Sequence, residues 1–175
     1  MSIGPRVVFT RFSSASSPKL GPWREHAARV MGHTPEMVEP TLESRYASMP
    51  DREPESPGES AIVWHLVSAN NRMLARSAQI FRRFDDAVDR AERTVAAAAL
   101  LEVSYVGDES RGMHGWLAVS GGTTVMTCAR WYLSDRDRRH SIDLAVTSIG
   151  LAMLRPGARL IDPAILQGGV VRGSI

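Results

Sequence analysis

The sequence predicts an α+β fold in which two successive units, each made of strands, a helix and a further strand, form one antiparallel sheet with two helices packed on one face. Three observations support this prediction. Residues 62–99 read as a hairpin, a short extended segment and a helix. A weaker copy of that pattern begins near residue 113. Residues 1–60 have a composition of their own, rich in Pro and Ser.

The first unit spans residues 61–108. Two apolar runs flank Asn70 and Asn71, and Asn is one of the few residues that tolerate the positive φ of a two-residue hairpin turn. In that register Arg72 and Arg76 point away from the core. The residues that share the core face of the sheet are then Ile62, Trp64, Leu66, Met73, Ala75 and Ser77.

A helix and a strand complete the first unit. The helix begins near Phe84 or Asp85, where two aspartates favour the positive end of the helix dipole. Residues 100–106 alternate and are rich in β-branched and aromatic types, which predicts a strand that ends near Gly107. The buried stripe of the helix is expected to contain Phe84, Val88, Ala91, Val95 and Ala99.

The second unit spans residues 113–163. The run WLAVS at 116–120 aligns with WHLVS at 64–68, so we expect Trp64 and Trp116 to be buried alike. Ser134 with Asp137 resembles a capping box, which predicts a helix from there that ends before Pro156. Residues 158–162 then provide the last strand.

Residues 1–60 contain eight of the ten prolines and an acidic, Pro-rich stretch at 50–60. This composition predicts an extended or largely disordered N-terminal segment. Two short ranges within it have the hydrophobic pattern of regular structure, which predicts a short strand at 6–12 and a short amphipathic helix at 23–31. They either fold back on the domain or dock on a partner. Residues 164–175 form a C-terminal tail.

The first unit resembles the YegP-like family of small uncharacterised proteins, in an aromatic strand, an Asn-containing tight turn, the pattern L-A-x-S, an aromatic residue and a following helix. The resemblance extends over residues 61–163. It implies tandem β-β-β-α-β units in a single sheet, with the last strand of each unit exchanged into the other, and it implies no established activity. The matching residues are Trp64, Leu66, Asn70, Leu74, Ala75, Ser77, Phe81 and Ala87, with Trp116, Met126, Cys128, Tyr132 and Ala145 as the weaker second set.

Composition argues against several function classes. The single cysteine, Cys128, cannot form an internal disulfide and favours a reducing compartment, so we expect a cytoplasmic protein. It also reads as a small buried residue rather than a nucleophile. No apolar run approaches the roughly 20 residues of a membrane-spanning helix. The five histidines lack metal-ligand spacing, so we expect no metal, no cofactor and no catalytic residue.

The second hairpin is expected to carry apolar residues on both faces, unlike the first hairpin with its outward arginines. The face opposite Trp116, Ala118 and Val125 needs cover, which the N-terminal segment, a second copy of the chain or a peptide partner could supply. We therefore expect a non-catalytic interaction or accessory module that binds a protein or peptide partner through this face. The residues of the face are Leu117, Val119, Met126 and Cys128.

An alternative is a nucleic-acid-associated protein. Arginines gather near the start of the second helix, and exposed Trp131 or Tyr132 would stack on bases. Against this, the formal net charge is only +2 and arginines alternate with acids along the chain. The predicted partner-binding residues for the two readings together are Leu117, Val119, Met126, Arg130, Trp131, Arg136, Arg138 and Arg139.

Overall fold

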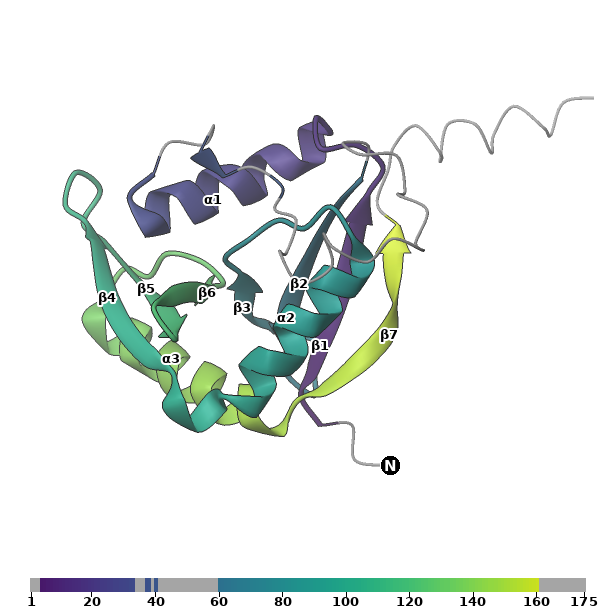
Figure 1. Cartoon of the computed structure of the whole chain (residues 1–175). Coiled ribbons are helices and arrows are strands. Elements are labelled where there is room, and N and C mark those ends of the chain that lie inside the picture. Colours follow the sequence, from purple (N-terminus) through teal and green to yellow (C-terminus); the bar gives the residue numbers. More distant parts are fainter. Residues whose placement is uncertain (1–3, 34–36, 39, 41–59, 161–175) are drawn as a thin grey trace, which may run out of the picture.

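The structure, a computed structural model, describes residues 4–33, 37–38, 40 and 60–160. It is α+β, with one mixed seven-stranded sheet in the order β4-β5-β6-β3-β2-β1-β7 (Figure 1). The strands are β1 (Arg6–Phe12), β2 (Ala61–Val67), β3 (Met73–Ser77), β4 (Glu102–Asp108), β5 (Met113–Ser120), β6 (Thr123–Cys128) and β7 (Met153–Leu160). The helices are α1 (Gly21–Met31), α2 (Phe84–Ala96) and α3 (Asp135–Leu151), with short 3-10 turns η1 (Pro18–Leu20) and η3 (Ala98–Leu100).

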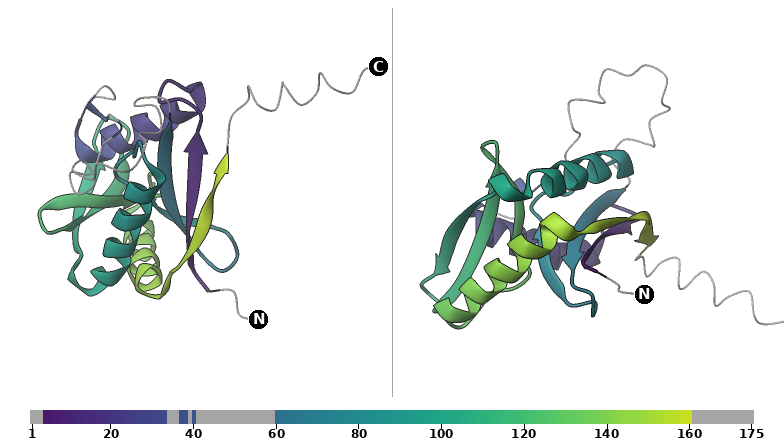
Figure 2. Two further views of the ribbon diagram at one scale, coloured as in Figure 1. Left: turned by 45° about the vertical axis from the view of Figure 1, so that its right-hand side comes forward. Right: turned by 90° about the horizontal axis from the view of Figure 1, so that it is seen from below.

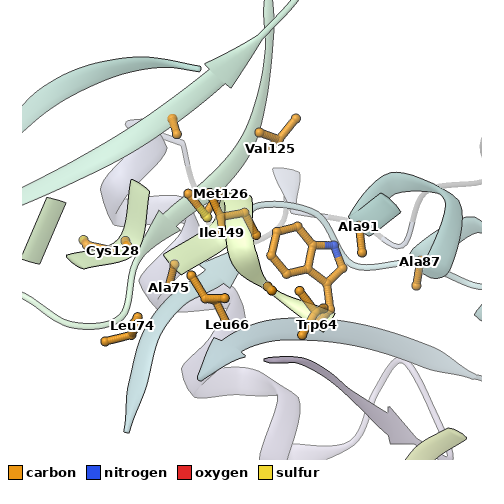
Figure 3. Close-up of a cluster of buried hydrophobic side chains, with 14 of the residues drawn as sticks. Trp64, Leu66, Leu74, Ala75, Ala87, Ala91, Val125, Met126, Cys128 and Ile149 are labelled. Atoms are coloured by element: carbon orange, nitrogen blue, oxygen red, sulfur yellow. The ribbon is translucent and has the colours of Figure 1, made fainter. Parts of the chain in front are cut away.

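The main core lies between the sheet and the helices α2 and α3. Trp64 and Trp116 are both fully buried in it, as predicted. Figure 3 shows Trp64 beside Ala87 and Ala91 of α2, with Ile149 of α3 nearby. A second cluster joins α1 to the opposite face of the sheet, which we call the outer face. It contains Leu20, Trp23, Ala27, Ala28, Phe12, Ala61, Val63 and Ile80.

The strand β4 lies beside the second unit, as the family resemblance implies, because it pairs antiparallel with β5 along its whole length. The strand β7 lies at the other edge, beyond the first unit (Figure 2). Between β7 and β2 stands β1, which is antiparallel to β2 and parallel to β7. The expectation of a purely antiparallel sheet is therefore wrong. The N-terminal strand enters between two oppositely directed strands and must run parallel to one of them.

Residues 4–33 belong to the fold, which corrects the prediction of an extended, largely disordered segment over this range. The strand predicted at 6–12 and the helix predicted at 23–31 are present as β1 and α1, and both fold back on the domain. Val7 and Phe9 of β1 are fully buried in the main core. The proline and the glycine at the two ends of α1 stand at permitted places. Pro22 lies in the first turn of α1, where a missing N–H is tolerated, and Gly32 caps its end with a φ of 70°. The predictions for residues 41–59 and 161–175 concern parts of the chain outside the described residues.

The first hairpin follows the predicted pattern except at its tip. Asn71 has the expected positive φ, at 63°. A register shift then follows, because Leu66 pairs with Ala75 but Val67 pairs with Met73. An extra residue on one strand turns the following side chains to the other face. Met73 therefore packs against the second cluster rather than the main core.

A similar irregularity reverses part of the second hairpin. Between Ala118 and Val119 the register shifts, and Ala118 pairs with Met126. Met126 and Cys128 are therefore fully buried in the main core together with Trp116. The predicted division of the hairpin into two apolar faces is wrong, since a bulge of one residue exchanges inward and outward positions.

The helix starts agree with the sequence, and one strand start does not. The helix α2 begins at Phe84, and Ser134 caps α3 by accepting a hydrogen bond from the N–H of Asp137 at 3.1 Å. Of the predicted stripe on α2, only Ala99 lies outside the helix, and it is exposed. The strand β7 begins at Met153, so Pro156 lies within this edge strand rather than marking its start.

Candidate ligand pocket

A pocket opens in the middle of the sheet where β3 and β6 separate. The two strands are joined by only three residue pairs, from Ala75 opposite Cys128 to Ser77 opposite Met126. Beyond Cys128 the chain leaves β3 and turns toward α3. The pocket at this fork has a volume of about 530 Å³ and is bounded by the start of β3, residues 129–133 and the first turns of α3.

The lining of this pocket is basic. Arg72, Arg76 and Arg130 all line it, against Asp137 as its one acidic residue. Among the residues that the structure describes, none of the three arginines has a carboxylate within ion-pair distance. The lining therefore carries three arginines against one aspartate, an excess of positive charge.

Arg76 is the most constrained of these arginines. Its Nε donates a hydrogen bond to the carbonyl oxygen of Ala129 at 2.8 Å, and its Cζ lies 5.0 Å from the ring centroid of Trp23 on α1. It faces outward from β3, as predicted, between His65 and Thr127 on the neighbouring strands. Burial lowers the pKa of the Arg76 guanidinium from its ordinary value. A half-buried cation without a counter-ion is costly.

The helix α1 contacts the pocket residues from behind. Its Trp23 stacks on Arg76, and its His26 and Arg29 flank the ring of Trp131, with a ring-centroid separation of 6.4 Å and a Cζ–centroid distance of 5.4 Å. His26 Nε2 lies 2.7 Å from the carbonyl oxygen of Cys128. Because a carbonyl can only accept, His26 must carry its proton on Nε2.

Two histidines at the contact between α1 and the sheet, His26 of α1 and His65 of β2, are held in their neutral form. Burial, and secondarily the nearby Arg76, lower the pKa of both His26 and His65 to about 4. Four buried polar atoms in this region have no hydrogen-bond partner in the described part of the chain: Trp23 Nε1, His65 Nδ1, Thr127 Oγ1 and Trp131 Nε1. Buried polar groups normally find partners, so the contact between α1 and the sheet contains four unsatisfied polar atoms.

The structure separates the residues that the sequence grouped as partner-binding. Arg130 and Trp131 line the pocket. Leu117 and Val119 are half-buried on β5, whose outer face contacts α1, and Met126 is fully buried in the main core. Met126 is thus removed from any binding surface.

The arginine cluster at the start of α3 is divided in the same way. Arg138 is buried, forms an ion pair with Asp135 and lies 4.1 Å from the ring centroid of Tyr105. Arg139 pairs with the same Asp135 at 2.8 Å. Arg136 is exposed and lies outside the pocket lining. Tyr132, expected to be exposed for stacking, is buried.

Sequence reasoning missed Arg72, Arg76, His140, Leu133 and Leu144 as pocket residues. A signal existed for the two arginines of β3, which the hairpin register directed away from the core. Their closeness to residues 129–133 depends on the pairing of β3 with β6, and no local pattern reveals that pairing.

The remaining chemical groups are not arranged as a reactive centre. Within the described ranges, no three His, Cys, Asp or Glu side chains gather as a metal site would require. Cys128 is buried and unpaired as a thiol, and burial raises its pKa to about 11, which disfavours the nucleophilic thiolate. No helix among the described residues is both long and apolar enough to cross a membrane.

The fold and the pocket define this chain as an α+β protein built on a mixed seven-stranded sheet with a basic pocket at its central fork. No family model matches it, and no curated protein matches it. Among solved structures it is similar to YegP from E. coli, a protein of unknown function determined by solution NMR. The identity is 12%, the match covers 59% of this chain and 83% of that chain, and the TM-score is 0.42. The sequence of this chain resembles the same family.

Proposed function

We propose that this protein is a non-catalytic binding module that receives a segment of a protein or peptide partner in the pocket at the fork of β3 and β6. The main support is an apolar rim beside a basic interior. Leu133 is 79% exposed and Leu144 is 36% exposed, and both line the pocket next to the half-buried Trp131. Apolar side chains exposed around a concave site are typical of binding surfaces.

We propose the pocket as the binding surface in place of the sheet face that the sequence indicated. That face loses Met126 to the core, and α1 already contacts β5 and β6. The volume of about 530 Å³ lies within the range of natural ligand pockets, roughly 300 to 1,000 Å³. A few side chains of a peptide would fill it.

We also propose that the two units are tandem repeats and that the pocket lies at their junction. The support is that each unit closes its extended segment with one isolated bridge before its helix, between Ile62 and Phe81 in the first and between His114 and Tyr132 in the second. The strands β3 and β6, one from each unit, then meet at the centre of the sheet.

Nucleic-acid binding has weaker support than peptide binding. Arg138 and Arg139, two of the four arginines proposed for it, both form ion pairs with Asp135, which occupies part of their charge. Tyr132 is buried, so one of the two stacking candidates is also withdrawn from the surface. The exposed arginines that remain are Arg130 and Arg136.

Selection from a random peptide display library tests the proposed function. Peptides recovered on the full chain are measured against Leu133→Glu and against Leu151→Glu, a matched control. Leu151, the last residue of α3, is 69% exposed like an accessible leucine of the rim, but it lies outside the pocket lining. Burial of one leucine contributes about 1.5 to 3 kcal/mol, so Leu133→Glu should weaken binding roughly ten- to hundredfold. The control should bind like the parent.

Two results would contradict the proposal. Peptides that bind the parent and Leu133→Glu equally well would place their site elsewhere on the molecule. Failure to recover any peptide with affinity above that for an unrelated basic protein would argue against peptide binding itself.

A further inference from the structure

We propose that the inner wall of the pocket is an oxyanion site, in which Arg76 is the counter-ion for a carboxylate or phosphate group of the ligand. This inference deepens the proposed function and rests on it for the identity of the partner. It assigns to the ligand a chemistry that the apolar rim alone does not specify.

The first argument is the state of Arg76. Its guanidinium is half-buried between the Trp23 ring and the Ala129 carbonyl oxygen, and it lines the pocket. Within the described residues it has no carboxylate partner. Burying a cation without a counter-ion costs free energy, and an anion that enters the pocket removes that cost.

The second argument is the row of residues across the outer face of the sheet. Strand pairing sets Arg76 between His65 on β2 and Thr127 on β6, and the next residue in the row is Leu117 on β5. His65 is neutral because burial and Arg76 lower its pKa to about 4. None of these neighbours carries a negative charge that could pair with the Arg76 guanidinium.

The third argument is that two more arginines line the pocket, against one acidic residue. Arg72 and Arg130 line it together with Arg76, and His140 lies on the α3 side. Guanidinium groups only donate hydrogen bonds, and their forked geometry matches the two oxygens of a carboxylate or phosphate. Asp137 also lines the pocket and opposes an anion, but it is outnumbered by the arginines.

The positions of the three arginines also explain why Arg76 should contribute most to the affinity for an anion. Arg72 and Arg130 are exposed, and Arg130 lies 5.6 Å from the ring centroid of Tyr132. Exposed cations are screened by water and salt, so their attraction for an anion is weak. Arg76 is pre-oriented by its stack and its hydrogen bond, and it loses less freedom when an anion binds.

Titration of the full chain with inorganic phosphate and with succinate, in a buffer that contains neither, tests this site. The readout is the NMR signal of the arginine Nε–H groups together with calorimetric affinity. We expect the Arg76 Nε–H signal to shift on saturation. Arg76→Gln should bind at least tenfold more weakly, Arg130→Gln two- to fivefold more weakly, and Arg136→Gln like the parent, because Arg136 lies outside the pocket.

The variants include their own structural checks. Arg76→Lys keeps the charge and should retain part of the anion affinity. If Arg76 had only a structural role, Arg76→Lys and Arg76→Gln with equal melting temperatures would bind the anion equally well. If Arg76→Gln fails to fold, the parent titration and Arg130→Gln still decide the matter. Tighter binding of phosphate indicates a phosphorylated partner, and tighter binding of succinate indicates an acidic side chain or terminal carboxylate.

Two outcomes overturn the anion site: neither anion shifts the Arg76 signal, or Arg76→Gln binds either anion as the parent does. In the first case, a decathymidylate probe that binds through Arg136 would indicate nucleic-acid binding instead. The inference and the proposed function fail separately. Peptide binding that persists unchanged in Arg76→Gln refutes the anion site alone, and anion binding without peptide binding refutes the peptide function alone.

Discussion

Acidification from pH 7 to pH 4.5 should loosen α1 from the sheet, because it protonates two histidines that the fold keeps neutral. His26 and His65 lie under or on α1, and burial together with Arg76 lowers the pKa of each to about 4. The charged groups that face them are Arg76 of β3 and, for His26, Arg29 of α1. The Cys128 thiol stays neutral, since burial raises its pKa to about 11. Protonation would therefore set positive charges beside positive charges.

The sign and size of the effect follow from linkage. In the unfolded chain a histidine has a pKa of about 6.5, so below that pH the unfolded state binds more protons than the folded state. The stability gained from neutral histidines is complete above the unfolded pKa and is lost as the pH falls toward 4. At pH 4.5 the loss is about 2.5 kcal/mol per histidine, an order-of-magnitude value from 1.36 kcal/mol per pKa unit.

The carboxylates do not obscure this window. Hydrogen bonds from Ser110 and Arg29 lower the pKa of Asp108, and the hydrogen bond from Arg138 lowers the pKa of Asp135. Groups with a lowered acidic pKa contribute stability that is lost only at lower pH, below the ordinary value of about 3.9. The stability contributed by Asp108 and Asp135 is therefore lost below the interval between pH 6.5 and pH 4.5, in which the two histidines titrate.

Urea unfolding at pH 7 and at pH 4.5, followed by tryptophan fluorescence, measures the effect. The parent should lose several kcal/mol between the two pH values, and His26→Gln with His65→Gln should lose much less. His33→Gln, which changes an exposed histidine just after α1, is the control and should behave like the parent. Equal pH dependence of the parent and the double variant would refute the assigned role of these two histidines.

Three further predictions concern the fold. Trp64→Ala should cost about 3 to 5 kcal/mol in urea unfolding, because Trp64 is fully buried, and a parent-like midpoint would contradict its place in the core. A chain without residues 1–33 should show no cooperative thermal transition by circular dichroism, since β1 stands between β2 and β7; a sharp transition would mean that β7 can pair with β2 directly. In Gly115→Ala the new Cβ would lie 2.9 Å from Cζ3 of Trp131. That variant should lose about 1 to 3 kcal/mol and shift the Trp131 indole signal, whereas an unchanged spectrum would show that the ring is free to move.

Local features of the fold were predictable because they depend on adjacent residues. The positive φ of Asn71, the start of α2 at Phe84 and the cap at Ser134 each follow from short-range sterics or hydrogen bonding. The bulges were not predictable in this way. One extra residue on β6, Val125, lies opposite the step from Ala118 to Val119 and carries Met126 from the expected outer face to the core. Strict alternation has no means of detecting it.

The N-terminal strand shows a second kind of limit on local reasoning. Residues 6–12 were identified as strand-like, but their composition gave no indication that they would enter the centre of the first half of the sheet. The register of β1 against β2 and β7 is set by burial of Val7 and Phe9 against residues far away in the sequence. Such long-range pairing overrides the disorder suggested by the surrounding prolines.

The pocket was predicted in part. Arg130 and Trp131 were nominated because they stand together in the sequence near a helix start. Arg138 and Arg139 were nominated on the same ground, although their spacing from Asp135 is that of helical ion pairs. Arg76 could not be joined to Trp131 before the pairing of β3 with β6 was known.

The most direct test is an NMR titration of the full chain with an acidic peptide recovered from the display library. The account predicts that the Nε–H signal of Arg76 and the indole signal of Trp131 change together with the methyl signals of Leu133, while the methyl signals of Leu151 stay unchanged. Changes confined to the free edges of β4 or β7, with Arg76 and Trp131 unaffected, would contradict it.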